Sequence, residues 1–187
     1  MTTVTLDDWA YLHQARIRGF LPFNEAHKPE LAGLIEAKLL QETPVGIILT
    51  TDGMATHSAE LEAWRSQADL ALLEKTYSRF LSVNQEMKSG CSTWQTSQRD
   101  SEAAMKIEDL LRGILDRVKP ALARASKLAG RFGDYGDRLE GALRRAASGE
   151  HRYFTDPTVD SFHTVWFECH EDYLVTLDRS REEEGSH

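Results

Sequence analysis

Two histidines near the C-terminus are the residues best suited to proton transfer. His163 and His170 lie seven positions apart in a segment that we expect to be helical, and at about 100° per residue both fall on its apolar face. Burial keeps an imidazole neutral near pH 7, which is the state that a general base requires. We therefore interpret His163 and His170 as candidate catalytic residues that exchange protons with a bound ligand.

Other polar and aromatic residues occupy positions from which they could reach these histidines. Asn84 lies in an apolar seam between Phe80 and Met87, and polar side chains that converge from facing helices build the ligand sites of helical bundles. Aromatic residues such as Trp94 would pack on the apolar face of a ligand. The candidate ligand-binding residues are Tyr77, Asn84, Trp94, Gln95, Trp166 and, on the first helix, His13.

A purely structural role stays open for the same residues. Asn84, His163 and His170 could satisfy one another's hydrogen bonds, or those of backbone carbonyls, inside an apolar core. Large aromatic residues on apolar stripes, such as Trp94 and Trp166, are also common core residues. A hollow beside the histidines would favour ligand binding, whereas complete packing around them would favour the structural role.

The sequence lacks the common motifs of metal, nucleotide and nucleophile sites. His163 and His170 are separated by about 10.5 Å of helix, which is too far to share an ion, and no HExxH or Glu-x-x-His pair occurs. Cys91 and Cys169 have no CxxC spacing and are interpreted as reduced, buried thiols. No GxSxG, Walker or GxGxxG motif is present. We therefore expect no metal and no cofactor.

Several other titratable residues are expected in solvent. Glu168 and Asp172 lie four positions apart and off the apolar face of the last helix, a spacing typical of a solvated surface. Three further histidines fall near loops or at helix starts, where we also expect exposure: His27, His57 and His151.

The composition is that of a soluble globular protein. The chain has 187 residues, of which 41% are hydrophobic and 28% charged. Its 22 lysines and arginines oppose 30 aspartates and glutamates, for a net charge of −8, so bulk attraction to nucleic acid or to an anionic membrane is not expected. No apolar run approaches the roughly 18 residues that a membrane helix needs, and no signal peptide pattern begins the chain. We expect a cytoplasmic protein.

Apolar periodicity predicts a mainly α fold with one small β-hairpin. A helix is predicted from Leu6 to about Gly19, and a second over residues 29–41. The turn at Pro44 to Gly46 and the β-branched residues after it predict a hairpin that closes at residue 53.

The rest of the chain is predicted to be helical. Residues 54–97 have the spacing of one or two long helices, and the next helix is expected from Ser101 until Pro120 stops it. Pro120 can open another helix that continues to Gly149. A last helix is predicted over residues 157–177.

The segment LIEAKLLQETPVGIILTTDGMATH resembles the end of a winged-helix domain, in which a leucine pair precedes a wing hairpin and a long helix. The segments FLSVNQEMKSGCSTWQ and YFTDPTVDSFHTVWFECHEDYL are similar to those of actinobacterial proteins labelled as MarR-type regulators. The resemblance implies a shortened, degenerate winged-helix region over residues 1–57. A helical domain over residues 58–177 and a mobile charged tail over residues 178–187 would follow it.

The residues of this winged-helix-like region do not favour DNA reading. A helix-turn-helix reader needs two helices before the wing, and the segment between Gly19 and Leu39 has room for one. Residues 29–42 contain Lys38 as their one cation and residues 43–52 contain none, so the usual source of phosphate binding is missing. Dimerisation or a distant basic patch could compensate, the patch being Arg144, Arg145 and Arg152.

We expect a small-molecule-binding protein that holds a small aromatic or metabolite-like ligand in its helical half. In its catalytic form it would be a cofactor-free acid–base enzyme of specialised metabolism. One alternative is a dimeric winged-helix transcriptional regulator that senses a ligand and binds DNA in a salt-dependent way. Another is a helical interaction module in which residues 54–97 form the seam of a homodimer.

Overall fold

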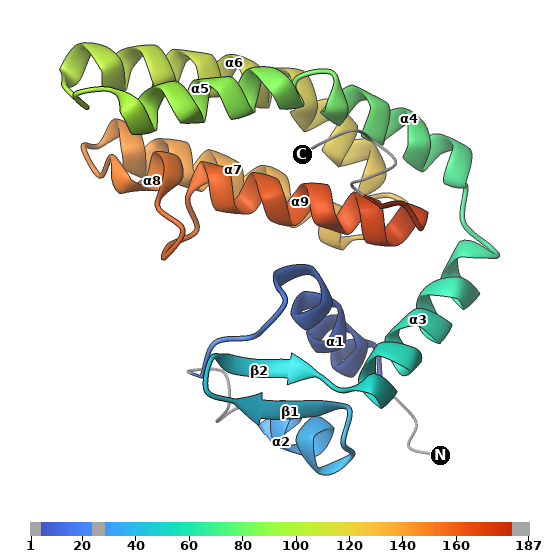
Figure 1. The fold of residues 1–187 in the computed structure, drawn as a ribbon. Helices are drawn as coiled ribbons and strands as arrows, with labels where there is room; N and C mark the ends of the chain where they lie inside the picture. The colour runs from blue at the N-terminus through green and yellow to red at the C-terminus, as the bar shows by residue number, and fades with distance from the viewer. Residues whose placement is uncertain (1–4, 24–28, 181–187) are drawn as a thin grey trace. The chain divides into compact units, whose positions relative to one another are not determined.

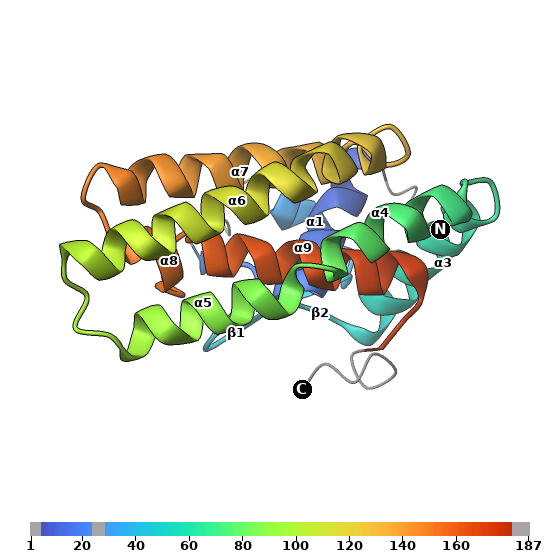
Figure 2. The same cartoon turned by 90° about the horizontal axis from the view of Figure 1, so that it is seen from above.

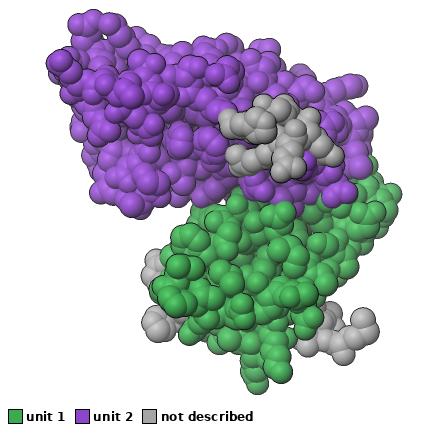
Figure 3. Space-filling view, viewed as in Figure 1, with its two compact units in different colours: residues 1–68 green, residues 69–187 purple. Residues whose placement is uncertain are grey.

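The computed structural model describes residues 5–23 and 29–180, which form a mainly helical protein with one small antiparallel hairpin (Figure 1, and from above in Figure 2). This confirms the predicted fold class. The chain divides into two compact units, Met1–Ala68 and Asp69–His187 (Figure 3). The boundary expected near residue 57 falls inside a helix, so the first unit extends further than the sequence indicated. His27 and residues 181–187 of the tail lie outside the described residues.

The first helix, α1 (Leu6–Arg18), has the bounds that its end signals predict. The Thr5 side chain accepts a hydrogen bond from the Asp8 backbone N–H at 3.1 Å, and the Asp8 carboxylate accepts one from the Thr5 N–H at 2.9 Å. These reciprocal bonds satisfy two of the free N–H groups at the start of the helix. Gly19 ends the helix in the left-handed conformation, with φ at 81°.

The second helix is shorter than predicted. Helix α2 (Pro29–Glu36) does not continue to Gln41, because Lys38 adopts a left-handed conformation with φ at 59° and turns the chain. The next residues form strand β1 (Leu40–Thr43), which pairs in antiparallel register with β2 (Gly46–Leu49). The hairpin itself is confirmed, but the leucine pair does not end the helix, because Leu39 follows the turn and Leu40 begins the first strand.

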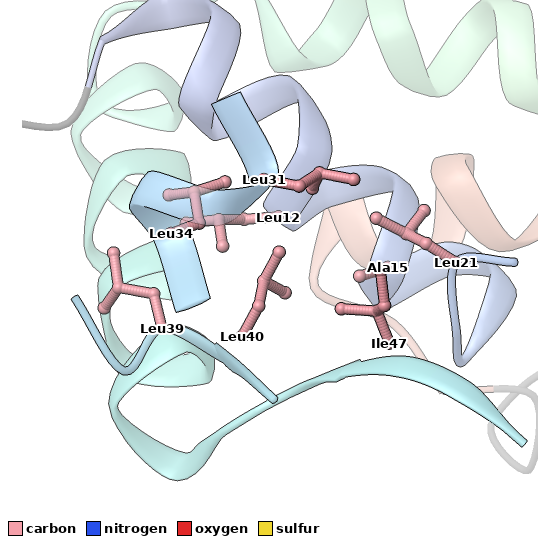
Figure 4. Packing of buried hydrophobic residues seen from close by; sticks show 8 residues of the cluster. All are labelled: Leu12, Ala15, Leu21, Leu31, Leu34, Leu39, Leu40 and Ile47. Atoms are coloured by element: carbon pink, nitrogen blue, oxygen red, sulfur yellow. The ribbon is translucent and has the colours of Figure 1, made fainter. Parts of the chain in front are cut away.

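A single residue outside the hairpin adds to it. Leu21 and Ile47 form an antiparallel bridge, in which each backbone N–H donates to the other residue's carbonyl at 2.7 and 2.9 Å. Gly46 permits this approach, since a Cβ at that position would lie 2.6 Å from the Leu21 carbonyl oxygen. The bridge closes the hydrophobic core of the first unit (Figure 4), whose buried members are Leu12, Ala15, Leu21, Leu31, Leu34, Leu39, Leu40 and Ile47.

Residues 54–97 form parts of three helices, where one or two were predicted. They are α3 (Thr51–Arg65), α4 (Leu70–Leu81) and α5 (Asn84–Thr96). Helix α3 starts early because the Thr50 side chain accepts a hydrogen bond from the Gly53 N–H at 3.0 Å. Asp69 caps α4 in the same way, through the Leu72 N–H at 2.9 Å.

Proline does not stop the longest helix. Helix α6 (Ser101–Ala125) runs through Pro120, and α7 (Arg131–Ala147) follows it, so the predicted break at Pro120 is wrong. Pro120 provides no N–H for the carbonyl of Asp116, which costs stability. Tertiary packing on both sides of the proline offsets this cost, through the buried residues Val118, Ala121, Leu122 and Ala125.

The last helix is central to the second unit. After the short helix α8 (Arg152–Thr155), α9 (Phe162–Leu177) begins where the Ser161 side chain accepts from the Thr164 N–H at 3.2 Å. It starts later than the predicted residue 157. Helix α9 packs against α4, α7 and α8, and each of its residues is buried or half-buried. None of the described helices is both long and apolar enough to cross a membrane.

Candidate functional site

His170 lies in the interior of the second unit, as predicted. Its Nε2 is 3.0 Å from the hydroxyl oxygen of Tyr77, with which it forms a buried hydrogen bond. The ring centroid lies 5.9 Å from that of Tyr77 and 5.8 Å from that of Phe80. The structure therefore brings together two of the predicted site residues, Tyr77 and His170, among tightly packed aromatic rings.

His163 does not join them. It is half-buried in the first turn of α9, where its ring packs on Phe167 at 4.6 Å, so the prediction that both histidines are buried is wrong for His163. One face of the helix carries both residues, but about 10.5 Å of helix separates them. Partial burial lowers the pKa of His163 below its ordinary value, which keeps the ring neutral near pH 7.

Asn84 and Trp166 also lie inside the unit, and they bond to each other. The Trp166 indole N–H donates to the Asn84 side-chain oxygen at 2.9 Å, and the indole stacks on Phe80 at 4.2 Å. The bond occupies the side-chain oxygen of Asn84, which was expected to orient a ligand, and the Trp166 ring, which was expected to pack on the ligand, packs on Phe80. For this pair the geometry fits the structural role that the sequence left open.

Helix α9 carries a buried charge that its sequence pattern did not predict. Asp172 was expected in solvent, but it is fully buried and accepts hydrogen bonds from Arg131 Nε at 3.0 and 3.1 Å and from the Tyr135 hydroxyl at 3.1 Å. The Thr176 hydroxyl donates to the same carboxylate at 2.8 Å. Burial and the nearby Asp172 carboxylate raise the pKa of Tyr135 well above its usual value. These contacts join α7 to α9.

A second ionic cluster joins the same two helices. Arg138 Nη1 lies 2.7 Å from the Glu168 carboxylate, and Arg138 Nε donates to Asp160 at 3.0 Å. Burial opposes the charge on Arg138, but the bonds to Glu168 and Asp160 outweigh burial and raise its pKa. Glu168 is therefore not the solvated residue that its spacing indicated, since its side chain is 11% exposed.

His13 belongs to a buried cluster of the first unit. Its Nδ1 lies 2.9 Å from Nε2 of His57, and the ring of Trp9 stacks on it at 4.5 Å. His57 was expected in solvent, but it is 1% exposed. Residues 53, 57 and 61 recur at four-residue steps along α3 and form its buried stripe, which is a signal that the sequence contained.

Trp94 and its neighbour Gln95 have different surroundings. Trp94 is 4% exposed and packs edge-on against Phe154 at 5.0 Å and against His151 at 5.7 Å. His151 is half-buried by this contact and not fully solvated as predicted. Gln95 is exposed, so its predicted place beside the interior histidines is wrong. One residue along a helix is a rotation of about 100°, which turns Gln95 away from the core.

Trp94 also lies at the floor of a surface groove between α5 and α6, which run side by side (Figures 1 and 2). This Trp94 groove has a volume of about 420 Å³. Its apolar lining is Gly90, Trp94, Ala103, Ile107 and Leu110. Gly90 lets the two helices approach, because a Cβ there would lie 2.2 Å from Leu110 Cδ2. The lining does not include His163 or His170.

Polar and charged residues form the rim of the Trp94 groove. The carboxylates are Asp100, which accepts the Ala103 N–H at 2.8 Å as the cap of α6, and Glu102. Lys106 is the rim cation, and its Nζ lies 2.6 Å from the Glu102 carboxylate. Two carboxylates against one ammonium leave the rim with an excess of one negative charge. Thr93, Ser97 and Gln98 add uncharged hydrogen-bonding groups.

The two cysteines lie in the core and do not have the properties of catalytic nucleophiles. Cys91 and Cys169 are both buried and free, as the sequence predicted. Burial raises the pKa of Cys91 to about 12, and burial raises that of Cys169 well above its ordinary value. Both thiols are therefore protonated and unreactive at neutral pH. Among the described residues, no group of three or more His, Cys, Asp or Glu side chains could hold a metal ion.

Comparison with known proteins gives no information on the function of this chain. No family model matches the chain, and no significant match was found among curated proteins or among solved structures. The resemblance to winged-helix and MarR-type regulators therefore stays a prediction.

Proposed function

We propose that this protein binds a small aromatic molecule in the Trp94 groove. The observation that carries the proposal is the combination of an apolar lining that includes Trp94 and a polar rim around a volume of about 420 Å³. Ligand sites have this construction, with a mostly apolar lining, a few polar groups and a volume of roughly 300 to 1,000 Å³. Trp94 is the predicted ligand-binding residue on which the proposal rests.

The charges of the rim select among aromatic ligands. Asp100 is held by its bond to the start of α6, and Glu102 pairs with Lys106. An aromatic carboxylate would add a further negative charge to a rim that already has one in excess. A neutral ligand avoids this repulsion, and its hydroxyl can bond to Thr93 or Gln98 at the rim. We infer that the ligand is neutral or cationic.

The acid–base enzyme remains an alternative with less support. The His170 imidazole is hydrogen-bonded to Tyr77 and enclosed by aromatic rings. His163 has the neutral imidazole that a general base needs, but it does not line the Trp94 groove. A cofactor-free enzyme of specialised metabolism would therefore have to bind its substrate next to His163, outside the Trp94 groove.

The regulator alternative rests on the order of elements in the first unit. Helix α1, the Leu21–Ile47 bridge, α2 and the hairpin follow one another as the parts of a winged helix do. The exposed residues of α2 include Ala32, Gly33 and Glu36, and the hairpin has no lysine or arginine. These surfaces offer few cations for contact with DNA phosphates, so small-molecule binding is the better supported proposal. We place this binding protein in the cytoplasm, as a monomer or a homodimer.

Naphthol and naphthoate provide a direct test of the proposed site. Both have the same aromatic body, and they differ in the charge that the rim should discriminate. We expect isothermal titration calorimetry to give tighter binding of naphthol to the wild-type protein. Ala103 is half-buried and lines the groove. In Ala103→Phe the larger side chain should fill part of the groove and reduce the apolar area that naphthol buries there, so we expect the affinity for naphthol to fall about tenfold.

The matched control is Ala123→Phe on the same helix. Ala123 is exposed and outside the groove, so this variant should bind naphthol as the wild type does. His163→Ala should also leave naphthol binding unchanged, whereas a loss of binding there would favour the acid–base alternative. Equal binding by wild type and Ala103→Phe, or no binding by the wild type, would reject the Trp94 groove as the site.

A further inference from the structure

Helices α4 and α6 enclose a second hollow, and most of its charged side chains are basic. Its volume is about 510 Å³. Lys75 and Arg79 line it from α4, Arg117 and Arg124 line it from α6, and Asp116 is the one acidic residue in the lining that the described residues form. Asp116 and the Glu86 carboxylate that pairs with Arg117 offset two of the four cations, which leaves an excess of two positive charges on a chain whose net charge is −8. We call this hollow the basic groove.

The cations of the basic groove are spread along its length. Lys75 and Arg79 are one turn apart, about 6 Å along α4, and Arg117 and Arg124 are two turns apart, about 10.5 Å along α6. One phosphate group is too small to contact all four side chains over this length. An anion with two or more phosphate groups could bridge them.

Two of the arginines are already held in place by the protein. Arg79 Nε donates to the Arg117 carbonyl at 3.3 Å, which ties the two walls together. The Arg117 guanidinium donates to the Gly113 carbonyl at 3.0 Å and pairs with Glu86 at 2.8 Å. Side chains that are fixed before binding lose less conformational entropy when a ligand arrives.

Lys75 and Arg124, the other two cations of the basic groove, are not held by ion pairs of this kind among the described residues. Both are exposed. A guanidinium can bind two oxygens of a phosphate at once, and an ammonium binds as a point charge. The basic groove thus combines two positioned arginines with two cations that are available to an incoming anion.

Pro120 belongs to the same wall of the basic groove. It lines the groove together with Asp116, and because proline has no N–H, the Asp116 carbonyl lacks its ordinary donor four residues ahead. Leu72, Thr76 and Ala121 complete the lining.

We propose that the basic groove binds a small organic molecule that carries two or more phosphate groups. This site goes beyond the Trp94 groove, which has a negatively charged rim and would repel such a ligand. A hollow of about 510 Å³ matches a single small ligand, whereas a nucleic acid needs a long basic stripe and gains nothing from a chain with a net charge of −8.

Pyrophosphate, orthophosphate and a single-stranded oligonucleotide are the probes for this site. We expect calorimetry at low ionic strength to show tighter binding of pyrophosphate than of orthophosphate to the full chain. The variant Lys75→Gln/Arg124→Gln should weaken pyrophosphate binding about tenfold or more, since it removes two charge-assisted contacts. It should leave naphthol binding unchanged, so that the two proposed sites are tested separately.

The control variant is Lys127→Gln/Arg112→Gln, which removes the same charge from positions outside the groove. It should bind pyrophosphate as the wild type does, and circular dichroism should show that both variants fold. An equal loss in both variants would mean that the net charge of the protein, and not the groove, attracts the anion, and would overturn the proposal. Absence of pyrophosphate binding by the wild type would overturn it too, as would binding of the oligonucleotide alone.

Discussion

The Tyr77 hydroxyl and His170 Nε2 lie 3.0 Å apart in the core of the second unit, although 93 positions separate the two residues in the sequence. Tyr77 is on α4 and His170 on α9, so this one bond links the start of the helical unit to its end. Phe80 and Tyr173 pack beside it, with ring centroids 5.6 Å apart. Its surroundings are those of a core contact, in which a lost partner is costly.

Removing the Tyr77 hydroxyl should destabilise the protein. In Tyr77→Phe the ring remains, but the hydroxyl that bonds to His170 Nε2 is lost inside the core. We expect the free energy of unfolding to fall by about 1–3 kcal/mol, the cost of an unmet buried polar group. Urea unfolding measures it. In the control Tyr153→Phe, a half-buried ring that packs on Arg145 is retained, so the change should stay within about 0.5 kcal/mol.

Asp172 should matter more for stability than any exposed ion pair. Asp172→Ala leaves the Arg131 guanidinium, 23% exposed, without the carboxylate that it now contacts at 3.0 Å. Loss of one partner of a buried pair costs about 3–5 kcal/mol. Thermal unfolding should show a large loss for Asp172→Ala and no measurable loss for Glu150→Ala, which breaks the exposed pair with Arg145. Similar losses for the two variants would contradict this assignment.

The hairpin turn should not tolerate a side chain at Gly46. Its φ is 144°, and a Cβ would lie 2.6 Å from the Leu21 carbonyl oxygen, so Gly46→Ala combines backbone strain with a clash. We expect a loss of about 1–3 kcal/mol or more. Gly33→Ala is the control, because a Cβ there meets nothing within 4 Å, and in a helix this change stabilises by up to about 1 kcal/mol. Chemical denaturation should show a lower free energy of unfolding for Gly46→Ala and an unchanged or higher one for Gly33→Ala, which would support the close approach of Gly46 to Leu21.

Apolar periodicity predicted most helices but not where neighbouring ones separate. Leu40 is buried both in the predicted helix and in the observed strand, so its apolar character could not tell the two apart. At Pro120 the local preference for a break lost to the packing of buried residues on both sides. Capping residues such as Asp69 were visible in the sequence, and they mark the helix starts that apolar periodicity alone did not reveal.

The candidate site was harder to predict because burial depends on which helices surround a residue. The helical projection of α9 assumed one buried face, but α4, α7 and α8 all pack against this helix, and Asp172 is therefore interior. Trp94 was predicted as a ligand-binding residue with a core role left open, and the groove beside it depends on the approach of α5 and α6 at Gly90. Pairs such as His13 with His57 come from distant segments, which spacing cannot join.

Neither thiol should react in the folded protein. Burial raises the pKa of Cys91 to about 12 and holds Cys169 in the protonated form, so almost no thiolate is present near pH 8. An aromatic disulfide reagent should therefore release no colour from the native protein and should modify both cysteines once urea unfolds it. Rapid reaction of one cysteine before unfolding would show that its helix opens locally.

His163 should make the protein less stable in acid. Burial lowers its pKa in the folded state below the ordinary value of 6.5, so the unfolded chain binds a proton more readily than the folded chain does. The stabilising contribution of the neutral ring is complete above pH 6.5 and is lost as the pH falls from there through the lowered folded pKa. In His163→Gln this contribution is missing. The melting temperature of the wild type should therefore decline more steeply than that of the variant between about pH 7.5 and pH 5, and parallel curves would show that His163 has the same pKa in both states.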